Sequence, residues 1–276
     1  KNGNVVITRY NDAGTVVRRE TSKLDVGSDT RENDLTNALA RMFSSDQQVV
    51  YFTMGHGERR FDDKPESIKL LANQIGAKGI PVKQLRLLEG HIPEDAGVIV
   101  IAGPTIDLLD FEREMLDQYL ANGGKVFVMI DPMLGAANPL TNMEQLLVNL
   151  NVQAKNVFVV DPDAVNITGL PLTPLAAMAK HPITDATNKA PFVLQTSREL
   201  LPVDTNNTSL TQEALLITTA KVWSEPADNL KSTRRAVPPE DPKDIHTRCV
   251  GVALEKKTAS GRYGEVMRAV IVTDSD

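Results

Sequence analysis

The chain has few of the residue types that build disulfide and metal sites. Its 276 residues include one cysteine, Cys249, so an internal disulfide is impossible and a multi-cysteine zinc or iron–sulfur site is excluded. The four histidines, at positions 56, 91, 181 and 246, are far apart in sequence. No apolar run reaches the roughly 18 residues of a membrane-spanning helix, and no N-terminal signal peptide is present.

The charge balance is mildly acidic, which argues against two classes of partner. Thirty Lys and Arg residues against 36 Asp and Glu residues give a net charge of −6 and a pI of about 5.4. Binding to nucleic acid or to anionic lipid needs a concentrated basic surface, so neither is expected. Hydrophobic residues make up 41% of the chain, enough for a sizeable core in a soluble globular protein. The chain starts at Lys1 and stops directly after a strand-like run, so we expect a piece of a longer protein.

Alternating strand and helix patterns fill residues 46–160 and predict an α/β domain. Apolar runs predict strands over 49–53, 97–102, 125–130 and 156–160, and the alternating residues 82–87 predict a strand at a sheet edge. Helical spacing predicts helices over 65–77, 108–121 and 141–150. The capping-box pattern Thr141-Asn142-Met143-Glu144 is expected to open the third helix. This order predicts a mostly parallel sheet with helices on both faces.

The rest of the chain is less regular. Residues 1–45 are expected to form a hairpin, with strands over 4–10 and 15–19, and a helix over 30–43 that packs on the main domain, residues 46–276. Proline-rich residues 161–191 and charged residues 224–247 predict two long loops. Further strands are expected near 192–196, 214–219, 249–255 and 267–272.

Polar residues follow three of the predicted parallel strands. Gly55-His56-Gly57-Glu58 follows the first, Thr105 follows the strand over 97–102, and Asp131 follows the strand over 125–130. The carboxyl ends of parallel strands share one edge of the sheet, where ligands bind in open α/β folds. We therefore expect Gly55, His56, Gly57, Glu58, Thr105 and Asp131 to line a crevice there. The Asp274-Ser275-Asp276 end joins them if the last strand is parallel.

Less specific interpretations of these residues stay open. His56 could be a turn histidine that hydrogen-bonds to the backbone, and Asp131-Pro132 is typical of a turn. A hydrolase using His56, Glu58 and Asp131, metal-assisted or not, is the alternative hypothesis. Against it, the Gly-x-Ser-x-Gly elbow is absent, and Cys249 lies in a late strand where it is expected to be a core thiol. Neither a P-loop nor a complete Gly-x-Gly-x-x-Gly is present, so no cofactor is expected.

An ordered set of motifs carries a family resemblance. It comprises Glu32 to Ala38, Val50 to Glu58, Ile92 to Ala96, Gly103-Pro104, Tyr119 to Lys125, Ile130 to Pro132, His181 to Thr184, Trp223-Ser224 and Thr273 to Asp276. Together these resemble the soluble region of the auxiliary component of ABC-type transport systems related to the gliding-motility protein GldG.

The resemblance implies a fold, a role and a location. The implied fold is flavodoxin-like or similar to class I glutamine-amidotransferase domains without their catalytic cysteine. The implied role is non-enzymatic: a binding or scaffold domain on the extracytoplasmic (periplasmic) face, within a membrane-anchored protein whose partners are ABC permease and ATPase subunits. By analogy with such folds, a small polar ligand or a glycan is the expected occupant of the crevice. A third hypothesis is a purely structural domain that docks other subunits.

Overall fold

The structure is a computed structural model that describes residues 3–10, 16–24, 48–62, 64, 67–135, 139–185, 191–204 and 206–275. Strands β1 (Gly3–Tyr10) and β2 (Val16–Leu24) pair antiparallel in a two-stranded sheet of their own, which confirms the two N-terminal strands. The helix expected over 30–43 lies outside the described residues, and its packing on the main domain stays a prediction.

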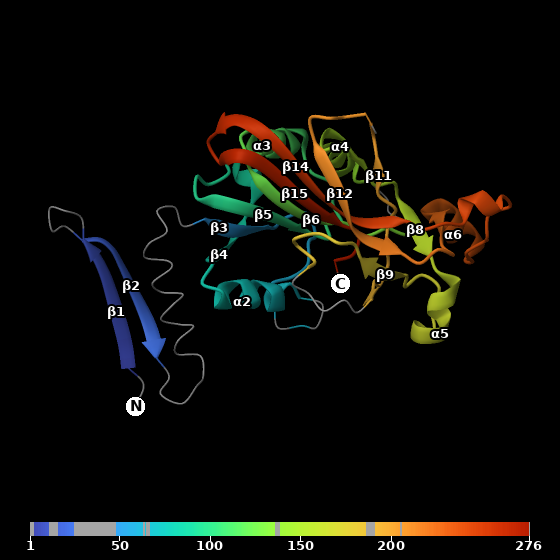
Figure 1. The fold of residues 1–276 in the computed structure, drawn as a ribbon, viewed down its shortest axis with the longest axis horizontal. Coiled ribbons are helices and arrows are strands. Elements are labelled where there is room, and N and C mark those ends of the chain that lie inside the picture. The colour runs from blue at the N-terminus through green and yellow to red at the C-terminus, as the bar shows by residue number, and fades with distance from the viewer. Residues whose placement is uncertain are drawn as a thin grey trace.

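In the described part of the chain, nine strands form one mixed sheet (Figure 1). In spatial order they are β10 (Phe192–Val193), β9 (Leu175–Met178), β12 (Thr211–Thr218), β14 (Cys249–Gly261), β15 (Gly264–Val272), β6 (Lys125–Met129), β5 (Ala96–Ala102), β3 (Val49–Thr53) and β4 (Val82–Leu85). The five strands from β15 to β4 are parallel, and the others pair antiparallel. The sheet is therefore half parallel, less than the sequence predicted.

The parallel half follows a doubly wound order. Numbered along the chain, its strands lie in the order 2-1-3-4-5, and the direction of winding changes between β3 and β5. In such sheets ligands bind outside the carboxyl ends of the strands at this switch point. The loops after β3 and β5 are therefore the expected place for a site.

One predicted parallel strand pairs elsewhere. The run over 156–160 forms β8 (Val157–Val160), which pairs antiparallel with β13 (Trp223–Pro226) in a separate sheet. The position beside β6 is taken by β15, whose residues Arg268–Val272 pair with Lys125–Met129. An apolar run shows that a strand is buried, but it does not identify the strand that pairs with it.

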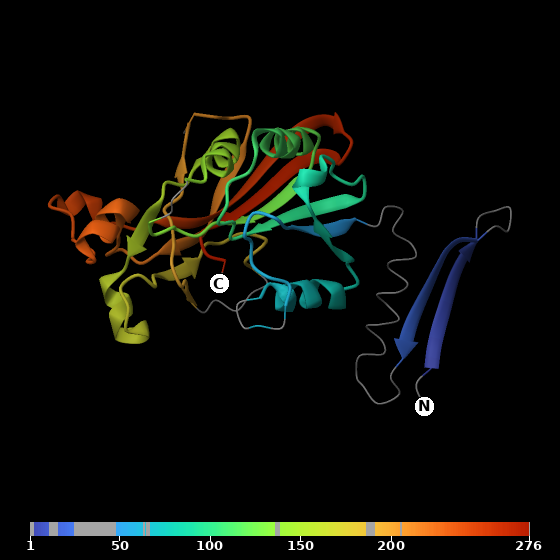
Figure 2. The ribbon, with the colours of Figure 1, turned by 180° about the vertical axis from the view of Figure 1, so that it is seen from behind.

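Helices cover both faces of the parallel half, as predicted (Figure 2). Side chains on β5 alternate: Ile99 and Ile101 pack in the cluster that contains α3 (Asp110–Ala121) and α4 (Thr141–Asn149), whereas Val100 packs toward α2 (Lys69–Ala77). Full burial of each such side chain contributes about 1.5–3 kcal/mol. The continuous apolar sequence of β5 is thus explained by burial on two faces.

Two helix starts differ from the sequence-based expectation. α2 begins at Lys69, whose N–H donates to the Ser67 hydroxyl, rather than at residue 65. The predicted Thr141–Glu144 capping box is wrong: the amides of Asn142 and Met143 donate instead to the Asp107 carboxylate, a cap supplied by a loop 35 residues earlier.

The two predicted long loops contain short elements. Residues 161–191 include η2 (Pro162–Ala164), α5 (Val165–Thr168) and β9, and residues 224–247 include most of β13, α6 (Ala227–Thr233) and η3 (Pro242–Asp244). Ala227 and Leu230 are buried against Phe158, so α6 is part of a small core. The remaining elements are η1 (Leu87–Glu89) and the pair formed by β7 (Val152–Gln153) and β11 (Leu201–Pro202).

Candidate functional site

The loop after β3 is attached to the loop after β5 at the switch point. The amides of Thr105 and Ile106 donate to the carbonyl oxygen of His56, at 2.8 and 2.9 Å. Gly57 has a φ of +72°, a conformation that favours glycine, and a Cβ there would overlap the Thr105 hydroxyl. Gly57 therefore allows the loop after β3 to pack closely against Thr105, and the predicted proximity of His56 and Thr105 is confirmed.

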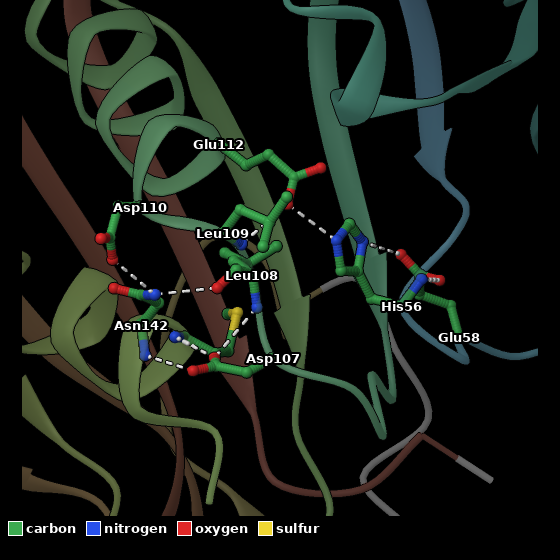
Figure 3. A network of polar contacts seen from close by, with 9 residues as sticks. His56, Glu58, Asp107, Leu108, Leu109, Asp110, Glu112 and Asn142 are labelled. Carbon is green, nitrogen blue, oxygen red and sulfur yellow. Dashed lines mark hydrogen bonds and ion pairs between the residues drawn. The ribbon is translucent and has the colours of Figure 1, made fainter. Parts of the chain in front are cut away.

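His56 is enclosed by two carboxylates (Figure 3). Its Nε2 lies 2.9 Å from Glu112 Oε2 and its Nδ1 lies 3.5 Å from Glu58 Oε1, while its backbone N–H donates to Glu58 Oε2 at 2.7 Å. Only 7% of His56 is exposed, and Glu112 is fully buried. The Nδ1 contact is too long and poorly aligned for a good hydrogen bond, so it is better described as an ion pair.

The carboxylates alter the protonation of His56. The contact with Glu58 is the largest cause of a raised His56 pKa; burial opposes it, and the charge of Glu112 adds to it. Burial alone would raise the pKa of Glu58, but its contacts with His56, backbone amides and Thr53 outweigh burial and lower it. Both shifts favour an imidazolium beside ionised Glu58.

Glu112 is held in place by the start of α3. Its Oε2 also accepts the Leu109 N–H at 2.8 Å, so the same oxygen caps the helix and contacts His56. Its other oxygen, Oε1, is buried without a hydrogen-bond partner. Next to it, Asp107 accepts amide protons from α4, and Asn142 donates to Leu108 O (Figure 3). This network joins the two helices beneath the His56 loop.

Asp131 belongs to a second polar network. Its carboxylate accepts the Ser275 amide at 2.8 Å, the Ser275 hydroxyl at 2.5 Å and an Arg59 guanidinium N–H at 3.2 Å. Arg59 also donates to Ser275 Oγ at 2.7 Å. Gly103 packs so closely that a Cβ would meet the Ser275 hydroxyl. The expectation that the end of the last strand joins the others at the carboxyl edge is therefore confirmed.

The predicted residues thus separate into two groups. His56 and Glu58 lie with Glu112 and Thr105, whereas Asp131 pairs with Arg59 and Ser275. Across the ranges that the structure describes, no three His, Cys, Asp or Glu side chains converge as a metal-binding group. The contacts of His56 and Glu58 and those of Asp131 therefore do not form a single cluster.

Two pockets flank the Gly55–Glu58 loop. One has a volume of about 460 Å³ and is lined by Met54, Gly55, His56, Arg86, Leu88, Ile106, Asp107, Leu109 and Glu112. The other, of about 370 Å³, is bordered by Glu58, Arg59 and Arg60. A larger pocket of about 550 Å³ lies far from these residues, around Lys256 and Lys257 at the amino edge. The switch-point position favours the 460 Å³ pocket as the candidate site.

Sequence reasoning missed several residues that build this edge. Glu112 lies on a helix and Arg59 follows the motif that was singled out, and neither has a local signature. Arg198 is buried and donates to the Asp131 carbonyl at 2.8 Å and to Glu144 at 2.7 Å. The one available signal was the pair of acidic residues in the first turn of α3, Asp110 and Glu112, which indicates a helix start rather than a contact with His56.

The chain is thus an α/β protein with a pocket at the carboxyl ends of its parallel strands. Residues 47–269 match the family described as ABC-type uncharacterized transport system, and the chain belongs to that family, as an auxiliary component of ABC transport. No curated protein matches the chain.

Three solved structures align with most of the chain. The mmIFT52 N-terminal domain gives a TM-score of 0.54 at 15% identity, over 83% of this chain and 86% of that one. A putative ThuA-like protein from Bacteroides uniformis gives 0.44 at 14% identity, over 84% and 83%. Exo-beta-1,4-mannosidase Op5Man5 from Opitutaceae bacterium strain TAV5 gives 0.40 at 12% identity, over 89% and 33%. At 15% identity the likeness to the mmIFT52 domain concerns the fold alone, and the two alignments with TM-scores below 0.5 do not establish a shared fold.

None of the helices in the described ranges has the length and apolarity that a bilayer crossing requires.

Proposed function

We propose that this chain is the extracytoplasmic, non-catalytic binding or scaffold domain of a GldG-like ABC transport auxiliary subunit. The full-length protein is anchored in the inner membrane and works beside a permease and an ATPase. Membership of the transport family supports the accessory role. The 2-1-3-4-5 order of the parallel strands supports the flavodoxin-like or amidotransferase-like assignment.

The observation that carries the non-catalytic assignment is how the polar groups at the carboxyl edge are used. Both ring nitrogens of His56 face carboxylates, so the imidazole is not paired with a hydroxyl or thiol nucleophile. Asp131 is engaged by Arg59 and Ser275. Cys249 lies in the core region on β14, and burial raises its pKa, which disfavours the thiolate. These contacts favour structural and binding roles.

The hydrolase hypothesis receives less support from this geometry. It needs His56, Glu58 and Asp131 to act on one substrate, each within about 3 Å of a reacting proton or one water away. In the structure Asp131 is committed to another network, and Glu58 is oriented toward His56. A pocket beside buried, mutually paired groups is better suited to hold a small polar ligand than to turn it over.

Co-purification of the full-length protein from its native membranes tests the proposed role. We expect a tagged full-length protein to recover a permease and an ATPase identified by mass spectrometry, and an unrelated membrane-anchored protein with the same tag to recover neither. Recovery of neither subunit would overturn the proposal, and hydrolytic activity of the 276-residue chain would then favour the hydrolase hypothesis.

A further inference from the structure

The 460 Å³ pocket has an exposed apolar wall. Leu88, Ile106 and Leu109 line it, and they are 69%, 59% and 50% exposed. They come from two segments: Leu88 lies in η1, and Ile106 and Leu109 lie in the loop between β5 and α3. Large apolar side chains gathered around a concavity are typical of a ligand site, where the ligand removes them from water.

The same pocket is bordered by a buried acid with unused hydrogen-bonding capacity. Glu112 lines the pocket and is fully buried, and its Oε1 has no hydrogen-bond partner, whereas Oε2 accepts from both His56 and Leu109. Buried polar atoms nearly always have a partner, so the unpartnered oxygen of this pocket-lining residue is a candidate acceptor for a donor from outside the chain.

The charges around His56 leave a negative excess. When His56 is protonated and Glu58 and Glu112 are ionised, these three side chains carry a net charge of −1. Asp107 adds a further carboxylate to the pocket lining, but its oxygens accept backbone amides of α4. Arg86 also lines the pocket; it is exposed, so solvent screens its charge. A buried, uncompensated negative charge attracts a cation.

We propose that this pocket binds a small organic cation: a primary ammonium that donates a hydrogen bond to Glu112 Oε1 and carries an apolar chain that covers Leu88, Ile106 and Leu109. The assignment rests on the proposed binding role and names the ligand class of that site. An ammonium satisfies the free carboxylate oxygen and cancels the excess charge, and the apolar chain buries the exposed wall.

Isothermal titration of the 276-residue chain with hexylammonium tests this assignment, with hexanol and hexanoate as probes of equal chain length. We expect saturable binding of hexylammonium, binding of hexanol at least about tenfold weaker because it lacks the charge-assisted hydrogen bond, and no binding of hexanoate. Equal affinity for hexanol and hexylammonium, or no binding of hexylammonium, would overturn the assignment.

Two variants separate the acid from the wall. Glu112→Gln should weaken hexylammonium binding by about tenfold or more. Because this buried change could disturb folding, Ile106→Ser provides a second test: it alters an exposed wall residue and should weaken binding several-fold. Ile167→Ser, the same change at an exposed position on α5, is the matched control and should leave binding unchanged. Equal effects of the two serine variants would contradict the assignment.

Different results would overturn the proposed ligand class and the proposed transporter role. Recovery of a permease and an ATPase without hexylammonium binding would overturn only the ligand class. Hexylammonium binding without recovery of those subunits would overturn only the transporter role.

Discussion

At the scale of single residues, His56 is the centre of the carboxyl edge. Its carbonyl anchors the loop after β5, its ring joins Glu58 to Glu112, and the neighbouring Gly57 permits the close packing against Thr105. Burial of a charged ring is tolerated because two carboxylates surround it. The residue therefore has structural importance whether or not a ligand is bound beside it.

The raised pKa of His56 predicts how stability depends on pH. A raised folded-state pKa means that the stabilising contribution is complete below the unfolded value of about 6.5 and is lost as pH rises through the folded value. We expect His56→Gln to lose less stability than the wild type between pH 6 and pH 9, measured by urea unfolding. An unchanged pH dependence would contradict the buried imidazolium.

Glu112→Gln gives an independent check of the same pair. Because the charge of Glu112 contributes to the raised pKa of His56, its removal should lower that pKa in an NMR titration of the ring. The pH dependence that Glu58 itself contributes has the opposite sign. Because the pKa of Glu58 is lowered in the folded state, its stabilising contribution is complete above the unfolded pKa and is lost as pH falls. A His56 pKa that does not change in Glu112→Gln would show that the two side chains do not interact.

Gly57→Ala tests the contact between the two loops. The left-handed backbone alone should cost about 1–2 kcal/mol, and overlap with the Thr105 hydroxyl should add about 1–3 kcal/mol. The matched control is Gly169→Ala, which has a similar φ of +81° but open space around its Cβ position. Equal losses of unfolding free energy in urea for the two variants would show that the loops are not tightly packed.

At the scale of elements, α4 depends on a cap from another segment. Asp107 accepts the amides of Asn142 and Met143 at 2.9 and 3.0 Å. Asp107→Ala should therefore destabilise the chain by about 1 kcal/mol, as for other lost helix caps. Asp110→Ala, at an exposed neighbouring position, should have a smaller effect in the same thermal or urea unfolding experiment. A larger loss for Asp110→Ala would contradict this assignment of the cap.

The strands that are buried on both faces were predictable, and their partners were not. β3, β5 and β6 lie within about a residue of their predicted bounds because parallel central strands require continuous apolar runs, and β4 is the edge strand that its alternation predicted. β8 has the same kind of sequence but pairs with β13. The local sequence pattern indicates that a strand is buried. It does not decide whether β8 or β15 takes the place beside β6, and in the structure β15 takes it.

The candidate site was predictable only for the residues that directly follow parallel strands. Residues that directly follow strands, such as His56 and Thr105, could be placed at one edge by topology alone. Glu112 could not, because its approach to His56 depends on how α3 packs on the sheet. Asp131 was placed at the correct edge, beside the end of the last strand, but its carboxylate pairs with Arg59 and Ser275 rather than with His56 and Glu58.

At the scale of the whole molecule, segments 216 positions apart meet at the carboxyl edge. Arg59, in the loop after β3, and Ser275, after β15, come together because β15 inserts parallel beside β6 and brings Thr273, Asp274 and Ser275 to the rim. The antiparallel strands β14, β12, β9 and β10 continue the sheet beyond β15, on the side opposite the switch point between β3 and β5. The mixed sheet thus keeps the switch-point pocket on one half of the domain.

We propose that the domain binds its ligand in this switch-point pocket. The most direct test of this proposal is an NMR map of backbone amide shifts in the 276-residue chain titrated with hexylammonium. We predict saturable shifts concentrated at Gly55, His56, Ile106 and Leu109. Shifts concentrated instead around Lys256 and Lys257 at the amino-edge pocket, or no saturable shifts, would contradict the claim.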